Sequence, residues 1–155
     1  MNRGTFYKHY QFKEDVLDEM VEEVIDSLAA SFQEPFLQYR TIEAKQLNKS
    51  VTKIFEHVYE YRNFYTVVVK SQVLSCFQDK ISAVLRDFSL QEFAHKKSDP
   101  HINIELLASY QAYAFLGMII EWIHDDFKHS PAYMADQLLR ILASHSPLAA
   151  ENDSF

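Results

Sequence analysis

The side chains that could carry chemistry in this sequence are few, and they form no catalytic pattern. The densest group is His124-Asp125-Asp126, which offers an imidazole and two carboxylates of the kind that bind transition metals. A metal-dependent helical hydrolase built on His124 and Asp125 would need further ligands, and His57 and His129 are only loose candidates. A polar helix end explains the group better. We therefore predict no catalytic residue, no metal ligand and no cofactor, and keep the hydrolase as the alternative function.

The small numbers of glycine and cysteine residues exclude further kinds of site. Gly4 and Gly117 are the only glycines, so the sequence lacks the glycine-rich loops that hold phosphates and nucleotide cofactors. Cys76 is the only cysteine and cannot form an internal disulfide, which fits a reducing, cytoplasmic compartment. We expect Cys76 to be a small buried hydrophobic side chain, because no basic neighbour marks it as a nucleophile.

Aromatic residues are concentrated in the middle and late parts of the chain. They combine apolar rings with hydroxyl or indole tips, which suits an inter-helical pocket for a small organic ligand. Ordinary core packing is the alternative interpretation for each of them. The residues that we expect to line such a pocket are Tyr61, Phe64, Tyr65, Phe77, Tyr110, Tyr113 and Trp122.

The elements that must position these residues are predicted to be helices throughout. Only two glycines and four prolines occur in 155 residues, which leaves few tight turns. Apolar residues recur at steps of three and four, as in amphipathic helices. The expected helices run from Lys13 to about Pro35, from Ile42 to about Tyr61, through 63–76 as a buried helix and on to Phe88, from Ile102 to Phe127, and onward from Ser130-Pro131.

Charge is distributed unevenly along the chain. The formal net charge is −7, yet residues 1–13 carry three basic side chains and no acid, while residues 14–34 carry eight acids and no Lys or Arg. We interpret the acids as the solvated face of one helix. No signal peptide is visible at the N-terminus. The apolar run 104–123 contains Glu105 and Glu121, so we expect a buried helix and no membrane span.

The basic segment at the N-terminus is also aromatic and rich in hydrogen-bond donors. Such a segment suits contacts with phosphates and with base edges in a groove of DNA. Its run Arg3-Gly4-Thr5-Phe6-Tyr7-Lys8-His9-Tyr10, followed by Lys13-Glu14-Asp15-Val16-Leu17, resembles the recognition helix and the following long helix of the TetR family of bacterial transcriptional regulators. The far end, with Gly117, Glu121-Trp122-Ile123, Phe127 and Ser130-Pro131, resembles the Firmicutes-type C-terminal domain of that family.

The resemblance implies a function and a set of sites. Arg3, Gly4, Tyr7 and Lys8 match positions that face bases, and Thr5, His9 and Lys13 match positions that contact phosphates. It further implies an all-α fold, a small organic effector bound among the middle helices, and a homodimer formed by the last two helices. The interface residues expected on this basis are Leu106, Tyr110, Gly117, Ile120, Met134, Leu138 and Ile141.

One departure from the family pattern affects DNA binding. A helix-turn-helix needs a helix that braces the recognition helix, and only Met1 and Asn2 precede Arg3. We therefore expect residues 1–13 to be a remnant of that reader, 14–34 a connecting helix, and 35–150 the effector-binding and dimerisation domain. The chain as given is expected to bind operator DNA poorly. A regulator that works through protein contacts is a related possibility.

Overall fold

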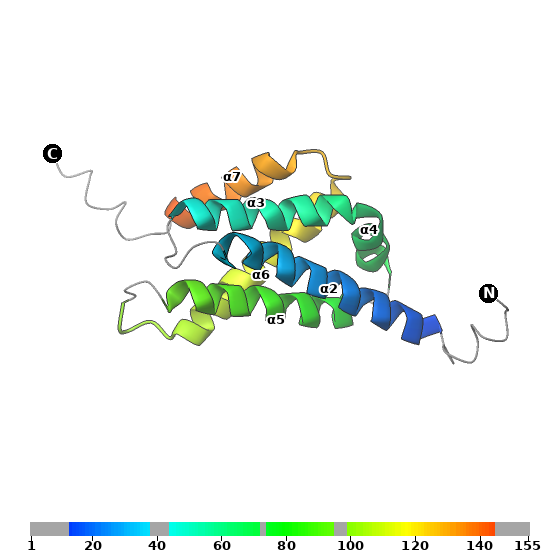
Figure 1. Ribbon diagram of the computed structural model, residues 1–155, viewed down its shortest axis with the longest axis horizontal. Coiled ribbons are helices and arrows are strands. Elements are labelled where there is room, and N and C mark those ends of the chain that lie inside the picture. The colour runs from blue at the N-terminus through cyan, green and yellow to red at the C-terminus, as the bar shows by residue number, and fades with distance from the viewer. Residues whose placement is uncertain (1–12, 38–43, 72–73, 95–98, 145–155) are drawn as a thin grey trace.

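The computed structural model describes residues 13–37, 44–71, 74–94 and 99–144 (Figure 1). Every regular element in these ranges is an α-helix, which confirms the all-α expectation. The helices are α2 (Lys13–Leu37), α3 (Ala44–Glu60), α4 (Arg62–Lys70), α5 (Leu74–Phe93), α6 (Ile104–His124) and α7 (Pro131–Ser144).

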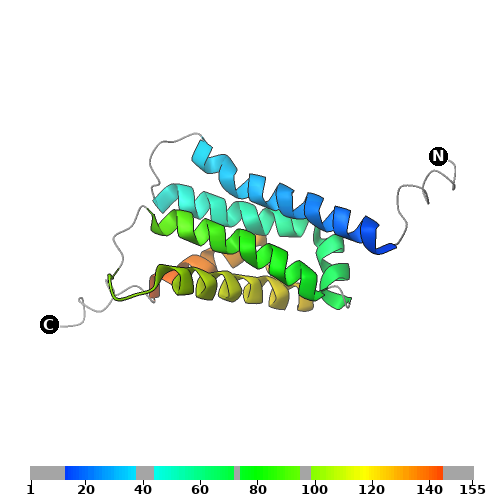
Figure 2. The same cartoon turned by 90° about the horizontal axis from the view of Figure 1, so that it is seen from below.

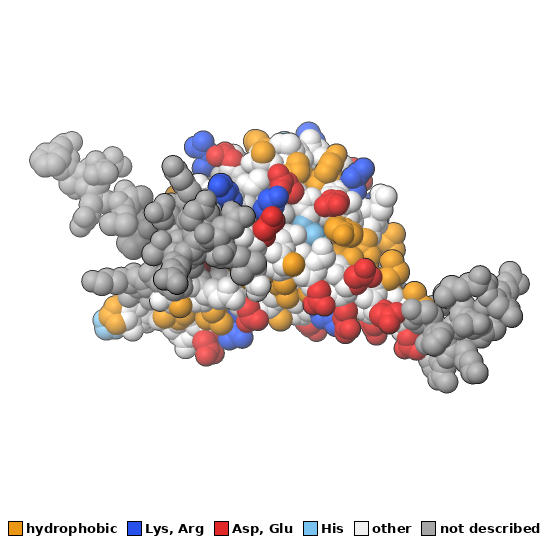
Figure 3. Space-filling view, in the orientation of Figure 1, with side chains coloured by type: hydrophobic (Ala, Val, Ile, Leu, Met, Phe, Trp, Pro, Cys, Tyr) orange, Lys and Arg blue, Asp and Glu red, His pale blue; other side chains and the backbone are white. Residues whose placement is uncertain are grey.

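Helix α2 is amphipathic, as its sequence pattern predicts. Its buried side is made by Val21, Val24, Ile25, Leu28 and Phe32, which all belong to the hydrophobic core. The acids occupy the opposite, exposed side, and Figure 3 shows them gathered over the first half of the helix. The helix begins at the expected residue and continues two residues past the expected end. It is thus an element of the core.

The five long helices form a bundle, and the short helix α4 crosses one end of it (Figures 1 and 2). Helix α2 packs against α3 and α5, α5 packs along α6, and α3 packs along α7. Helix α4 lies at the end of the bundle where α2 begins. The first turn of α2 and helix α4 are therefore at the same end of the bundle.

The core is centred on large side chains from α3, α4, α5 and α6. Phe55, Tyr65, Phe77 and Trp122 are among the largest fully buried residues. Trp122 meets Phe55 edge to face with ring centroids 5.6 Å apart, and its indole nitrogen donates a hydrogen bond to the backbone oxygen of His129. Aromatic pairs of this kind add about 1 kcal/mol each beyond the area they bury.

The segment 63–76 differs from the single buried helix that the sequence predicts. The chain is helical in α4, becomes extended at Ser71, and is helical again from Leu74. Within α4, Val68 and Val69 are buried while Val67 faces solvent. Cys76 is exposed on α5, so the expectation that it is buried was wrong; its neighbour Phe77 takes the core position.

Side-chain caps set the beginnings of the last two helices. The Asn103 side chain accepts a hydrogen bond from the Leu106 backbone N–H, and the Ser130 hydroxyl accepts one from the Tyr133 N–H. Helix α7 therefore begins where the Ser130-Pro131 pair predicts. Helix α6 ends at His124, three residues earlier than expected, because Asp126 and Phe127 adopt left-handed backbone conformations.

Helix α6 is long and apolar enough to cross a membrane by length and composition, and it is the only helix in the described ranges that is. A third of its most apolar stretch is buried in the bundle. One side of α6 therefore packs against the rest of the chain, while another presents apolar side chains to solvent.

Candidate effector and dimerisation sites

A small cavity lies inside the bundle between α2, α3, α5, α6 and α7. Its volume is about 50 Å³, and its walls are mainly apolar. Phe32 and Phe88 stack across it with ring centroids 3.8 Å apart. Pockets that hold drug-sized ligands measure roughly 300–1,000 Å³. The cavity is thus nearly filled by the protein's own side chains, and an organic molecule would have to displace some of them.

The cavity has a polar side as well as an apolar one. Ser89, Glu92 and Gln111 line it together with the apolar groups. The Ser89 hydroxyl donates to the Leu85 backbone oxygen, so its lone pairs stay available as acceptors. The full lining set comprises Phe32, Leu47, Val51, Ile54, Leu85, Phe88, Ser89, Glu92, Gln111, Phe115, Leu138 and Leu142.

The structure does not bring the seven predicted pocket residues together. Phe64, Tyr65 and Phe77 form one buried or half-buried cluster, with Tyr65 and Phe77 edge to face at 5.6 Å. Trp122 belongs to a second cluster with Phe55, Tyr59 and Phe127. Tyr61, Tyr110 and Tyr113 are exposed. None of the seven lines the interior cavity, so the prediction of that pocket's lining is corrected: aromatic content could not tell core and surface rings apart.

A buried polar pair joins α3 to α4. The Tyr65 hydroxyl lies 3.3 Å from Nδ1 of His57, to which it can donate, and the His57 ring also stacks on Tyr61. Burial lowers the pKa of His57 to about 4 and raises the pKa of Tyr65. Both groups are therefore neutral at pH 7. The remaining ring nitrogen, Nε2, is buried without a hydrogen-bond partner. Sequence reasoning missed this pair, although His57 stands between the core residues Phe55 and Val58.

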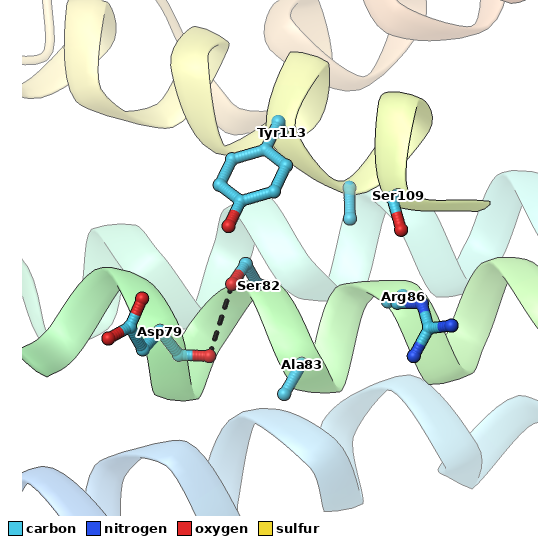
Figure 4. A pocket seen from close by; sticks show the side chains of 7 residues that line it. Asp79, Ser82, Ala83, Arg86, Ser109 and Tyr113 are labelled. Atoms are coloured by element: carbon cyan, nitrogen blue, oxygen red, sulfur yellow. Dashed lines mark hydrogen bonds between the residues drawn. The ribbon is translucent and has the colours of Figure 1, made fainter. Parts of the chain in front are cut away.

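A polar groove runs along the surface between α5 and α6 (Figure 4). It measures about 320 Å³, and Tyr113 leans over it from α6. Asp79 and Arg86 stand toward its two ends, and Arg86 pairs with Glu105 at 3.3 Å. The Ser82 hydroxyl in the middle donates to the Asp79 backbone oxygen. The groove offers opposite charges to polar molecules, and the sequence pattern gave no sign of it.

The exposed side of α6 carries large apolar groups. Leu106, Tyr110 and Tyr113 are 70%, 65% and 60% exposed, and Gly117 continues the same side. A Cβ atom added at Gly117 would meet nothing within 4 Å. Next to Gly117 lies a hollow of about 330 Å³ between α6 and α7. A continuous apolar surface of this kind is typical of a protein–protein interface.

The interface residues expected from the sequence fall into two groups. Leu106, Tyr110 and Gly117 on α6 and Ile141 on α7 are exposed, and Ile120 is half-buried. Met134 and Leu138 are buried in the chain's own core, so we remove them from the expected interface. Helical spacing of apolar residues indicates a packed face whether the neighbour is the same chain or a partner. The sequence pattern therefore could not separate core from interface.

Comparison with known proteins decides the family. A family model described as a transcriptional regulator C-terminal region, TetR_C_8, matches residues 45–144, more than half of the chain. The chain belongs to the TetR family of transcriptional regulators. A relative in Bacillus subtilis (strain 168), named as an uncharacterized HTH-type transcriptional regulator, YxbF, is 20% identical over 144 residues. The match covers 92% of this chain and 37% of that protein, so the chain spans little more than a third of this relative.

The TetR-family match covers the helices that hold the cavity and the exposed side of α6. The candidate DNA contacts Arg3, Gly4, Thr5, Tyr7, Lys8 and His9 lie outside the described residues, and Lys13 is the first residue of α2. His124 and Asp125, on which the hydrolase alternative rests, are both exposed at the end of α6. Among the described residues, no three His, Cys, Asp or Glu side chains are grouped to hold a metal ion.

Proposed function

We propose that this TetR-family protein is a cytoplasmic, ligand-responsive transcriptional regulator that acts as a homodimer and has no enzymatic activity. The observation that carries the proposal is the match of residues 45–144 to the C-terminal region of transcriptional regulators. The interior cavity supports a regulatory role, because its walls come from five helices and a molecule that enters must move them apart.

The long helix α2 offers a route from the cavity to the DNA-binding segment. Phe32 lines the cavity near one end of α2, and Lys13 at the other end leads on from residues 1–12. The nineteen steps between them span about 29 Å of helix. A ligand that separates Phe32 from Phe88 would tilt α2 and shift its far end, which would alter the distance between two recognition helices in a dimer.

The DNA contacts belong to the same proposal. Arg3, Gly4, Tyr7 and Lys8 would face bases of the operator, and Thr5, His9 and Lys13 would contact phosphates. The acidic side of α2 follows directly and would repel the DNA backbone. Because only residues 1–13 resemble part of a helix-turn-helix, we expect the 155-residue chain by itself to bind operator DNA weakly.

The test is DNA binding by a form of the protein with a complete helix-turn-helix. Fluorescence anisotropy would compare DNA from upstream of its own gene with a scrambled duplex of equal length. We expect selective binding that weakens as salt increases and depends on Arg3 and Lys8. Binding that does not distinguish the two duplexes would refute the proposal. So would equally tight binding by the double variant Arg3→Ala, Lys8→Ala.

The proposed dimer uses the exposed side of α6 together with α7. Its candidate residues are now Leu106, Tyr110, Gly117, Ile120 and Ile141, to which the structure adds Tyr113. Covering three large side chains that are more than half exposed would remove apolar surface from water, which favours association.

A further inference from the structure

The polar groove between α5 and α6 is separate from the interior cavity, and the two share no lining residue. The groove measures about 320 Å³, whereas the cavity measures about 50 Å³. Small-molecule pockets measure roughly 300–1,000 Å³. Ala112 is a buried part of the groove's wall, and the Tyr113 ring reaches over it from α6 (Figure 4). The groove therefore has room for a small molecule without a change in the core.

Opposite charges mark the two ends of the groove. Asp79 and Arg86 lie seven residues apart on α5, which places them on one side of the helix and about 10.5 Å apart along its axis. Figure 4 shows them on either side of Ser82. Arg86 would repel a molecule with amines at both ends, and Asp79 would repel a dicarboxylate. The groove therefore favours a molecule with an amine at one end and a carboxylate at the other.

The middle of the groove presents hydrogen-bond acceptors. The Ser82 hydroxyl donates to the Asp79 backbone oxygen at 3.1 Å, and the Ser109 hydroxyl donates to the Glu105 backbone oxygen at 2.9 Å. A hydroxyl has one hydrogen and two lone pairs, so both serines offer a bound molecule only acceptors while these bonds are kept. The groove therefore suits a ligand that carries N–H groups between its charged ends.

The Arg86 guanidinium keeps hydrogen-bond donors for a ligand carboxylate. Its Nη2 pairs with Glu105 at 3.3 Å, which is longer than the roughly 2.7–2.9 Å of a charge-assisted bond, and the Glu105 side chain is 77% exposed. Its Nε is buried without a hydrogen-bond partner among the described residues. A guanidinium group carries five N–H donors, so a second carboxylate can bind beside Glu105 or replace it.

We propose that this groove binds short zwitterionic peptides, with the ligand carboxylate at Arg86 and the ligand ammonium group at Asp79. An extended chain covers about 3.3–3.6 Å per residue, so a di- or tripeptide is about 7–11 Å long and matches the separation of the charged ends. Its peptide N–H groups would donate to the Ser82 and Ser109 hydroxyls. Only Tyr113 also belongs to the proposed dimer surface, so the inference does not depend on that dimer.

Calorimetric titration of the 155-residue chain with trialanine at pH 7 tests the site. N-acetyl-trialanine lacks the ammonium group and trialanine amide lacks the carboxylate, while both keep the rest of the peptide. We expect trialanine to bind and each capped form to bind at least about tenfold more weakly, because each leaves one charged end of the groove unpaired. No binding of trialanine up to about 10 mM, or equal binding of the three peptides, would overturn the proposal.

Variants that remove single charges locate the site on α5. Asp79→Asn and Arg86→Gln should each weaken trialanine binding roughly tenfold or more. Asp87→Asn is the matched control for Asp79→Asn, because it removes the same charge from an exposed position of α5 outside the groove, and it should bind as the unchanged chain does. Circular dichroism checks that each variant keeps its helix content. Equal affinities for Asp79→Asn and Asp87→Asn would overturn the proposal.

NMR of the backbone amides distinguishes the groove from the interior cavity. Trialanine should shift the signals of Ser82 and Ser109 and leave those of Val51 and Ile54, which line the cavity, unchanged. Larger shifts at the cavity residues would overturn the assignment to the groove and would support the proposed effector cavity instead. DNA binding by a form with a complete helix-turn-helix is measured separately, so failure of the peptide site and failure of the proposed function give different results.

Discussion

At the scale of the residue, His57 is the most unusual side chain in the core. It is 3% exposed, is held neutral by burial, and has one ring nitrogen bonded to Tyr65 and the other without a partner. Protonation of His57 would either place a cation in the core or require a local opening between α3 and α4. Since α4 lies at the end of the bundle where α2 begins, such an opening would occur at that end.

The low pKa of His57 predicts a loss of stability in mild acid. Its pKa is about 4 in the folded chain and 6.5 when unfolded, so between these values the unfolded state binds more protons. Stability is therefore lost as the pH falls from 6.5 toward 4. Urea unfolding should show that His57 accounts for a loss of roughly 2 kcal/mol between pH 7.5 and pH 5.

Over the same pH interval, the free energy of unfolding of the variant His57→Gln should fall by roughly 2 kcal/mol less than that of the unchanged protein. The exposed variant His129→Gln serves as the matched control and should keep the full pH dependence. An equal pH dependence in all three proteins would show that His57 does not remain neutral in the folded core.

Exposure agrees with the expected position of some residues and not of others. Leu106, Tyr110 and Gly117 were assigned to a dimer interface from a resemblance; they are exposed, and their role in an interface stays a prediction. Met134 and Leu138 were assigned to the same surface and are buried, because α7 packs them toward α3. The spacing of apolar residues predicts which face of a helix is buried. It does not predict which neighbouring element covers that face.

At the scale of the element, helix starts were predicted more accurately than helix breaks. The start of α2 and the start of α7 have local signals, a charged first turn and a Ser-Pro pair. The break between α4 and α5 has no glycine or proline to mark it. The helix ends before Ser71, which is extended, and no residue type near it marks that end in the sequence.

The cap of α7 can be tested directly. Ser130→Ala removes the acceptor for the Tyr133 N–H and should lower the free energy of unfolding by about 1 kcal/mol. Thr52→Ala is a suitable control, because the Thr52 hydroxyl bonds only within its own helix, to the Asn48 oxygen, and should change stability by less than about 0.5 kcal/mol. Equal effects in a denaturant titration would mean that Ser130 does not act as a cap.

The stacked pair Phe32 and Phe88 connects α2 to α5 across the cavity. Phe88→Leu keeps an apolar group but removes the ring, so we expect a loss of about 1–2 kcal/mol in thermal or urea unfolding. Val67→Ala, on the exposed side of α4, should be nearly neutral. If Phe88→Leu were equally neutral, the stack would not brace α2, and the proposed route from cavity to DNA would lose its mechanical basis.

At the scale of the whole molecule, two features are unexplained by a single chain. Helix α6 is apolar nearly all round but only partly covered, and a small cavity with walls from five helices lies towards one end of the bundle. The proposed dimeric regulator would account for both, since a second copy would cover α6 and an effector would open the cavity. The family could be recognised from sequence motifs. The small volume of the cavity and the hollow beside Gly117 could not, because both depend on how side chains from several helices meet.

The most direct test of this account is sedimentation equilibrium of the 155-residue chain. The chain has a mass of 18.2 kDa, and we predict a particle of twice that mass in the unchanged protein. Tyr110→Asp, which places a carboxylate in the centre of the interface, should give a folded monomer. A mass of 18.2 kDa for the unchanged protein at every concentration up to about 100 μM would contradict the account.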